Sequence, residues 1–300
     1  MPSWVEQTPE QRVLEAGYLV PTYGAVTGWG ALRWRGASSF DGVDRWDRPS
    51  PVSISTQFHR IRPQPGIALC EERFDVREAG SVDGIWVTSA VRSVCFVMRY
   101  AHDVCEAAVA LNSAALADLV PIEEASKWMH SHPSYTGIEQ GRDCLAFADE
   151  NCWSPMEGRM LVAWVRCTGG EAPLTNRPIF DLQGRHIGTP DLIDVQAGVI
   201  GQYDGRVHLA SAQRRRDVMR DATYREHGLE QVIAVAGDLG TRRFDDRLRQ
   251  AYLRAARRPA SGRTWTTELP RWWVPTFTVA QRRALTTSER RRWLGFRDAA

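Results

Sequence analysis

The chain has 300 residues, 43% of them hydrophobic and 25% charged, which is the composition of a soluble globular protein with room for two domains. No apolar run approaches the ~20 residues of a membrane span, and the N-terminus lacks the basic and apolar regions of a signal peptide. Composition therefore excludes membrane-spanning and secreted classes and predicts a cytoplasmic protein. The formal net charge is only +2, and Lys127 is the only lysine among 38 basic residues.

The first half of the chain is predicted to combine a small sheet with several helices. Thr8 and Pro9 open a helix as N-cap and first helical residue, and Thr27 begins a second. Strands are expected at residues 52–55, 67–70, 74–76 and 85–87. From Thr88 onward, apolar residues at i, i+3, i+4 and i+7 predict helices near 88–98, 104–111, 121–130 and 137–149.

The second half is predicted to open on a helix that begins at Ser154. Ser154 suits the N-cap, Pro155 the first helical position, and Glu157 the closing position of a capping box. A strand is expected at 178–182, then a hairpin of residues 192–195 and 199–203. A basic helix at 211–226, a strand at 231–236 and a helix at 239–256 follow, which together give an α/β fold.

The hairpin carries the candidate metal ligands. With a turn centred on Ala197 and Gly198, Asp191 lies across from Asp204, and strand alternation puts Gln202 on the same face. Carboxylate and amide oxygens at a strand end suit hard cations such as Mg²⁺. The alternative is structural, because Asp-Gly is an ordinary turn signal and Pro-Asp an ordinary strand entry. Capping alone would likewise account for Glu157.

The basic helix has two interpretations. Its arginines are Arg214, Arg215, Arg216, Arg220 and Arg225. They form either a solvated face, partly neutralised by acids one turn away, or a phosphate track beside the acidic hairpin. Arginine binds phosphate through its planar fork but cannot act as a base.

Four blocks in the second half carry a family resemblance. They are Ser-Pro-Met-Glu-Gly-Arg from 154, Pro-Ile-Phe-Asp-Leu-Gln-Gly-Arg from 178, Pro-Asp-Leu-Ile-Asp from 190, and Gly-Gln-Tyr-Asp-Gly-Arg-Val-His from 201. Together they resemble a bacterial endonuclease-domain family related to very-short-patch-repair endonucleases, in the PD-(D/E)xK, restriction-endonuclease-like superfamily. The resemblance covers residues 153–256 and implies a mixed sheet flanked by helices.

The resemblance also implies roles for individual residues. Glu157 matches the helix glutamate of the family, Asp191 the first hairpin acid, and Gln202 to Gly205 the Glu-Tyr-Asp-Gly block. His208 matches a histidine that often follows that block. Mg²⁺ or Mn²⁺ would be held by Asp191, Asp204 and Gln202, with catalytic roles for Glu157 and His208, and Arg214, Arg216 and Arg220 would bind DNA. Gln202 departs from the family, because it is a neutral ligand where glutamate is usual.

The first half resembles a second family. Gly-Ala-Val-Thr-Gly-Trp-Gly-Ala-Leu-Arg-Trp-Arg-Gly from 24, and Gly-Ile-Trp-Val-Thr-Ser-Ala-Val-Arg from 84, are similar to the AbiEi-like antitoxin module of type IV toxin–antitoxin systems. We therefore expect an α+β module at 1–150, a restriction-endonuclease-like domain at 151–257, and an Arg/Trp/Pro-rich C-terminal extension at 258–300. In that extension Trp272, Trp273 and Trp293 would either stack on bases or pin the tail to the domain.

Two functions that involve DNA remain in competition at this point, and a pure protein-interaction role is a third possibility. The first is a Mg²⁺-dependent endonuclease acting on DNA phosphodiesters, attenuated by Gln202. The second is a non-catalytic DNA-binding or antitoxin-like regulator of a toxin–antitoxin or phage-defence system, built on a degenerate nuclease fold. DNA is a partner in both, a toxin or defence-system protein is a further partner in the second, and no membrane partner is expected.

Overall fold

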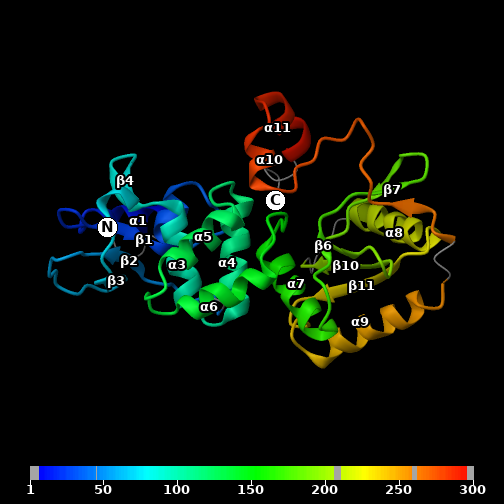
Figure 1. Ribbon diagram of the computed structural model, residues 1–300, viewed down its shortest axis with the longest axis horizontal. Coiled ribbons are helices and arrows are strands. Elements are labelled where there is room, and N and C mark those ends of the chain that lie inside the picture. Colours follow the sequence, from blue (N-terminus) through cyan, green and yellow to red (C-terminus); the bar gives the residue numbers. More distant parts are fainter. Residues whose placement is uncertain (1–6, 45, 206–210, 259–261, 296–300) are drawn as a thin grey trace. The chain divides into compact units, whose positions relative to one another are not determined.

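The chain folds into two units, each with its own sheet and helices (Figure 1). Unit 1 contains Met1–Glu150 and Thr278–Arg283, and unit 2 contains Asn151–Phe277 and Ala284–Ala300. The computed structural model describes residues 7–44, 46–205, 211–258 and 262–295, with the side chains of 211–218 also left undescribed. The expected α/β fold class, with mixed sheets flanked by helices, is confirmed. Within the described residues, no helix has the length and apolar character needed to cross a membrane.

Unit 1 is built on a five-stranded mixed sheet in the order β3-β2-β1-β5-β4. The strands are β1 (Ala25–Thr27), β2 (Val52–Ser55), β3 (Ile67–Cys70), β4 (Ala79–Val82) and β5 (Ile85–Thr88). The strand expected at 74–76 is wrong: Asp75 caps a short 3-10 helix, η1 (Val76–Glu78), through its side chain, and the strand β4 follows instead.

Helices cover the sheet of unit 1. They are α1 (Pro9–Gly17), α2 (Gly28–Trp34), α3 (Ala90–Tyr100), α4 (Val104–Leu116), α5 (Ile122–Ser131), α6 (Ile138–Asp143) and α10 (Val279–Arg283), with a 3-10 turn η2 (Cys144–Phe147). Val13 and Ala31 of the first two helices pack on Val26, Ile54 and Val87 of the sheet. Burial of these apolar side chains stabilises the unit in proportion to the area removed from water.

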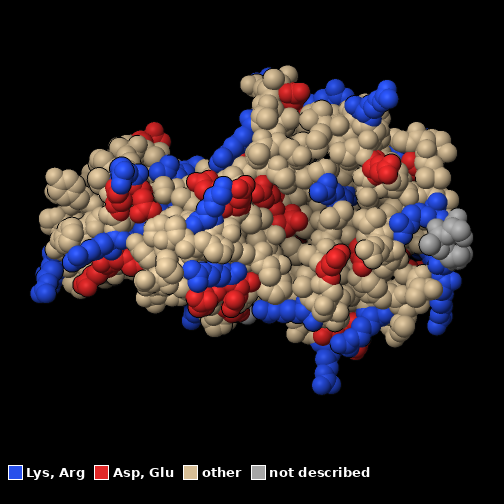
Figure 2. Space-filling view, in the orientation of Figure 1, with Lys and Arg blue, Asp and Glu red and all other residues tan. Residues whose placement is uncertain are grey.

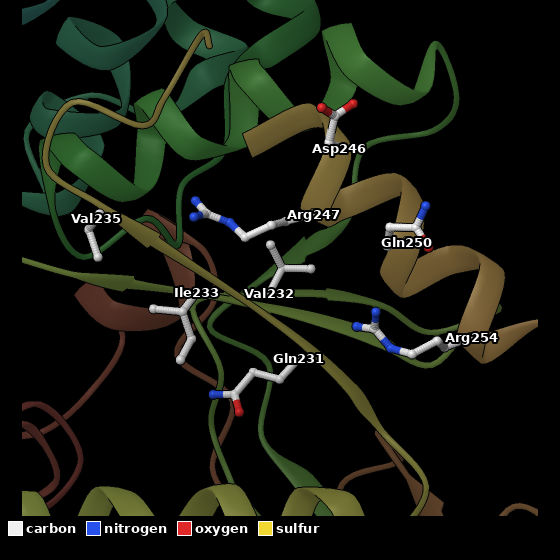
Figure 3. A pocket seen from close by; sticks show the side chains of 8 residues that line it. All are labelled: Gln231, Val232, Ile233, Val235, Asp246, Arg247, Gln250 and Arg254. Atoms are coloured by element: carbon white, nitrogen blue, oxygen red, sulfur yellow. The ribbon is translucent and has the colours of Figure 1, made fainter. Parts of the chain in front are cut away.

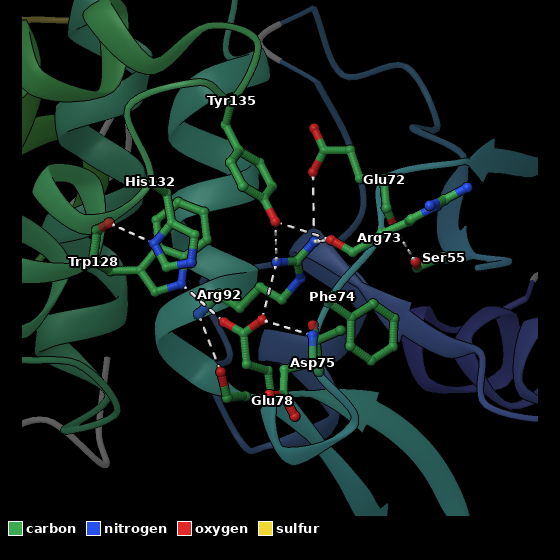
Figure 4. A network of polar contacts seen from close by, with 12 residues as sticks. Ser55, Glu72, Arg73, Phe74, Asp75, Glu78, Arg92, Trp128, His132 and Tyr135 are labelled. Carbon is green, nitrogen blue, oxygen red and sulfur yellow. Dashed lines mark hydrogen bonds and ion pairs between the residues drawn. The ribbon is translucent and has the colours of Figure 1, made fainter. Parts of the chain in front are cut away.

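Two buried arginines of α3 join the sheet side of unit 1 to its helices, and Figure 4 shows the first of them, Arg92, with its partners. Arg92 pairs with Glu78 at 3.3 Å and donates to the Arg73 carbonyl, and its guanidinium lies 5.5 Å from the Tyr135 ring. Arg99 forms a two-pronged pair with Glu72 at 2.8 and 2.7 Å. Every charge in this cluster has a hydrogen-bonded partner, which is the condition under which buried ions are tolerated.

A segment from the far end of the chain completes unit 1. The side chain of Arg282, in α10, is fully buried. It donates to Asp118 Oδ1 at 2.6 Å and to the carbonyls of Ala115 and Glu150 at 2.6 and 3.0 Å. These acceptors lie at the end of α4 and just before residue 151. Part of the extension predicted at 258–300 therefore belongs to the first unit.

Within its described residues, unit 2 contains two small sheets and four helices. Its elements are α7 (Pro155–Thr168), β6 (Leu174–Thr175), β7 (Ile179–Asp181), β8 (His186–Gly188), β9 (Leu192–Asp194), β10 (Val199–Asp204), α8 (Ser211–Glu226), β11 (Glu230–Val235), α9 (Arg242–Ala255), β12 (Trp265–Thr266) and α11 (Thr287–Leu294). The main sheet has the order β11-β10-β9-β6, and β12-β7-β8 form the second. The predicted strand at 178–182 corresponds to β7, which belongs to the second sheet, and β6 is the strand that pairs with the hairpin.

The main sheet of unit 2 is apolar on both faces, as alternation along its strands requires. Val199 and Val232 pack with Trp164 of α7 and Phe244 of α9 on one face. Ile193 and Ile200 pack with Tyr224 of α8 on the other. Figure 1 shows α8 and α9 on opposite sides of this sheet.

The tail tryptophans dock on the second sheet. The Trp272 and Trp273 rings lie 6.0 and 5.2 Å from the ring of Phe180 in β7, and Trp293 lies 5.1 Å from Trp273. These aromatic contacts fix the tail to unit 2, as one of the two sequence interpretations expected. About half of the Trp272 side chain stays exposed, at 52%.

We predict that Arg282→Ala lowers the free energy of unfolding of unit 1 by about 3 kcal/mol, because it leaves the carboxylate of Asp118 and two carbonyls without their buried donor. The adjacent Arg283 is exposed and also donates to carbonyls at the end of α4. Arg283→Ala should therefore cost less than about 1 kcal/mol. Urea denaturation of the full chain measures both, and equal losses would show that burial of Arg282 is not what stabilises the unit.

Candidate functional site

The register of the β9–β10 hairpin differs from the predicted one by two residues. Asp194 pairs with Val199 and Leu192 with Gly201, so the next position places Asp191 opposite Gln202. The expected pairing of Asp191 with Asp204 is therefore wrong. The cause is local: Asp194 accepts hydrogen bonds from Ala197 N through its side chain and from Gly198 N through its carbonyl, so Val195 belongs to the turn.

Glu157 lies in the first turn of α7 and is buried. Ser154 caps the helix by accepting from Glu157 N at 3.2 Å, as expected. The other half of the predicted capping box is wrong, because the Glu157 carboxylate accepts from Trp153 N at 2.7 Å, one residue before the cap. It also accepts from Ser154 Oγ at 3.0 Å and from Asn176 Nδ2 at 2.6 Å.

Asn176 connects Glu157 to Asp191. Its backbone has φ of 43°, in the left-handed region that asparagine tolerates better than most residues. Its N–H donates to the Asp191 carbonyl at 2.9 Å, while its side-chain amide holds Glu157. Among the described residues, Asn176 Oδ1 has no hydrogen-bond partner although it is buried. One residue therefore sets the distance between the start of α7 and the start of β9.

Both carboxyl groups of this pair have raised pKa values. Burial, and then the negative charge of Asp191, raise the pKa of Glu157 to about 7 from its ordinary 4.5. Withdrawal from water raises the pKa of Asp191 to about 6 from 3.8, against the opposing effects of the Tyr203 N–H and the charge of Arg220. The Tyr203 N–H donates to Asp191 Oδ2 at 2.6 Å. Near neutral pH the two groups therefore carry less negative charge than two carboxylates in water would.

Gln202 is buried, and donors already engage its side-chain oxygen. Gln231 Nε2 donates to Gln202 Oε1 at 2.7 Å, and Arg220 Nη2 donates to the same atom at 3.3 Å. Gln231 also donates to Asp221 Oδ1 at 3.0 Å. The amide oxygen of Gln202 is thus turned towards donors from α8 and β11, and this arrangement does not present it as a metal ligand.

The remaining predicted site residues are placed less centrally. Asp204 ends β10 and is exposed. His208 lies outside the described residues, as do the side chains of Arg214 and Arg216, whose backbone belongs to α8. Across the part of the chain that the structure describes, no three His, Cys, Asp or Glu side chains form a group able to hold a metal ion. The structure brings together Glu157, Asp191 and, through Arg220, Gln202.

Sequence reasoning missed three members of the site: Asn176, Tyr224 and Gln231. Tyr224 is fully buried, its hydroxyl has no partner among the described residues, and burial raises its pKa. A Cβ on Gly188 would lie 2.4 Å from that hydroxyl, so glycine is required there. Asn in a turn, Tyr on a helix and Gln on a strand are ordinary in these elements, and no pattern distinguishes them.

Comparisons of the chain with protein-family models, with curated proteins and with solved structures gave no match. The site is therefore interpreted from its own residues. Its chemistry is that of two adjacent, proton-binding carboxyl groups beside one guanidinium, at one end of a sheet covered by helices on both faces.

We predict that the metal-free chain becomes less stable as the pH rises from 5 to 8. Each folded-state pKa lies above its ordinary value, so the stabilisation present at pH 4 is lost as the pH passes 6 and then 7. The loss should be on the order of 2 kcal/mol, and Glu157→Gln should remove most of it. Urea denaturation in chelator measures this, with the exposed Glu171→Gln as control; an unchanged pH slope in Glu157→Gln would contradict the assignment.

A second prediction concerns the donors around Gln202. Both contacts to Gln202 Oε1 come from donors, so Gln202→Glu should be accommodated as an ion pair with Arg220. Arg220→Gln should then cost about 1 kcal/mol in the parent chain, where the acceptor is neutral, but about 3 kcal/mol with Glu at 202, where a charge is left buried. A double-mutant cycle in chelator measures the coupling, and additive losses would mean that Arg220 does not contact position 202.

Proposed function

We propose that unit 2 is a divalent-metal-dependent endonuclease acting on DNA phosphodiesters. The observation that carries the proposal is the Glu157–Asp191 pair, in which burial raises both pKa values and the charge of Asp191 raises the pKa of Glu157 further. Strongly perturbed carboxyl groups that neighbour one another mark functional sites more often than structural ones. The resemblance of residues 153–256 to the very-short-patch-repair-like endonuclease-domain family points to the same reaction.

The residues present fit a hard cation with a smaller ligand set than the sequence suggested. Among the described donors, Tyr203 N is the one hydrogen-bonded to the carboxylate of Asp191, through Oδ2, which leaves Oδ1 for a ligand. We assign Asp191 as the main ligand of Mg²⁺ or Mn²⁺ and Glu157 as its neighbour, since carboxylate oxygens suit these ions. Gln202 has a positioning role in this assignment, because its oxygen already binds Gln231 and Arg220.

Each group of the site would have its own role in phosphodiester hydrolysis. When bound, the cation would polarise the scissile phosphate and lower the pKa of an attacking water. Glu157, with a pKa near 7, is suited to hold or accept a proton at its carboxylate near neutral pH. Arg220 keeps a positive charge beside Asp191, where a phosphate oxygen would approach. Figure 2 shows acidic and basic side chains interspersed on the face in view, so phosphate binding rests on local arginines such as those of α8.

The test compares Asp191→Ala with Asp204→Ala in the full chain. We expect Asp191→Ala to abolish Mn²⁺ binding in calorimetric titration and to abolish Mn²⁺-dependent cleavage of single- and double-stranded DNA. Asp204→Ala should keep measurable metal affinity, because Asp204 is exposed at the end of its strand. Circular dichroism should be unchanged in both variants, since neither side chain belongs to the apolar core.

The outcomes separate the candidates. Unchanged Mn²⁺ affinity in Asp191→Ala would contradict the metal site. If the parent chain binds DNA but neither binds Mn²⁺ nor cleaves, the second candidate holds: a DNA-binding or antitoxin-like regulator on a degenerate nuclease fold. The observation that favours this candidate is the engagement of Gln202 Oε1 by two donors, where the resembling family has a glutamate. A toxin or defence-system partner would then be expected for unit 1, whose motifs resemble an AbiEi-like module.

A further inference from the structure

The strand β11 forms an open edge of the main sheet in unit 2. It is the terminal strand of the order β11-β10-β9-β6 and pairs with β10 in parallel along all six of its residues. Glu230 N donates inward to Gly198 O. Backbone groups alternate along a strand, so those of Gln231, Ile233 and Val235 point to the open edge. Val235 N is bound there by Asp238 Oδ2 at 3.1 Å, and in the described part of the chain no strand pairs with the others.

This edge lacks the features that normally prevent pairing. Residues 231–237 read Gln-Val-Ile-Ala-Val-Ala-Gly, without a charge or a proline. Ile233 and Val235 are each 41% exposed. Proteins usually protect an open edge with charged side chains, proline or a bulge, because a bare edge recruits another strand. A bare edge on a folded domain is therefore a candidate pairing surface.

A groove of about 650 Å³ runs beside this edge, between β11 and α9 (Figure 3). Val232, Ile233 and Gln250 line its middle. Its arginines are already neutralised, since Arg254 pairs with Glu230 at 2.8 Å and Arg247 pairs with Asp238. The groove thus offers an apolar and amide-lined centre with an ion pair towards each end.

We propose that β11 is a dimerisation strand, which pairs antiparallel with the β11 of a second copy of this chain. A two-fold axis at Val232 sets Gln231 of one copy opposite Ile233 of the other, and each such pair exchanges both of its backbone hydrogen bonds. This register uses the two residues with open backbone groups. It ends before Val235, whose N–H is bound by Asp238.

The pairing of all charges along the edge favours a second copy of this chain as the binding partner. A two-fold interface brings identical patches together, so any unpaired charge would meet its own kind. Glu230, the charged residue of β11, pairs with Arg254, and the flanking Arg247 pairs with Asp238, so identical surfaces meet without repulsion. The remaining charge of the groove lining, Asp246, pairs with Arg249 at 3.6 Å, so an acidic or basic partner would find no unpaired charge in this lining.

The experiment measures the molar mass of the full chain by light scattering over a range of concentrations. We expect the parent to form a dimer and Ile233→Lys to be monomeric, because the charge would face Gln231 of the other copy and lie diagonally across from the same charge in that copy. Leu182→Lys is the matched control: Leu182 is 64% exposed in unit 2 but lies outside β11. It should keep the dimer. Ile233 is exposed, so its replacement should leave the fold intact, which circular dichroism checks.

Hydrogen exchange provides a second measurement that does not depend on a variant. The amides of Gln231 and Ile233 should exchange more slowly at concentrations where the dimer forms, while that of Val235 should not change. A monomeric parent, a dimer that persists in Ile233→Lys, or a dimer lost equally in Leu182→Lys would each overturn the proposal. Protection that is independent of concentration would also overturn it.

Discussion

The candidate site depends on the contacts of Asn176. This residue joins the N-terminus of α7 to the start of β9, because its side chain binds Glu157 while its backbone binds the Asp191 carbonyl. Asn151 holds the same turn from outside by donating to the carbonyls of Thr175 and Asn176. The proximity by which Asp191 raises the pKa of Glu157 is therefore supported by a tightly hydrogen-bonded turn. Such an arrangement stores electrostatic repulsion, which the rest of the fold must offset.

The polar side chains on the α8 side of the sheet are held together by hydrogen bonds to one another. Gln202, Gln231, Arg220 and Asp221 form a network of hydrogen bonds that connects β10, β11 and α8. In this network the Gln202 oxygen accepts from two donors. Asp191 lies between the two environments, with a buried glutamate on one side and a guanidinium on the other. The protonation of Asp191 thus depends on its burial, on the Tyr203 N–H and on the charge of Arg220.

Sequence patterns predicted the elements better than their pairing. The basic helix spans Ser211–Glu226 as expected, and Ser154 and Thr8 cap their helices, because capping and periodicity are local properties. The predicted hairpin register was wrong because Ala197 N donates to the side chain of Asp194 and the turn is longer than predicted. The alternation of apolar and polar residues does not indicate the length of a turn. Gln202 remained on the predicted face, since a shift of two residues preserves alternation. The network around it comes from residues remote in sequence, so no spacing could indicate it.

Gln231 connects the site to the open edge of the sheet. Its side chain donates to Gln202 Oε1 and Asp221 Oδ1, while its backbone points away from β10. Strand pairing at the edge would fix the backbone of Gln231 and so restrict the amide that positions Gln202. Loss of that amide would leave the Gln202 oxygen with Arg220 as its donor in this network, at the longer distance of 3.3 Å. Gln231 thus links the position of Gln202 to any strand that pairs with the open edge of β11.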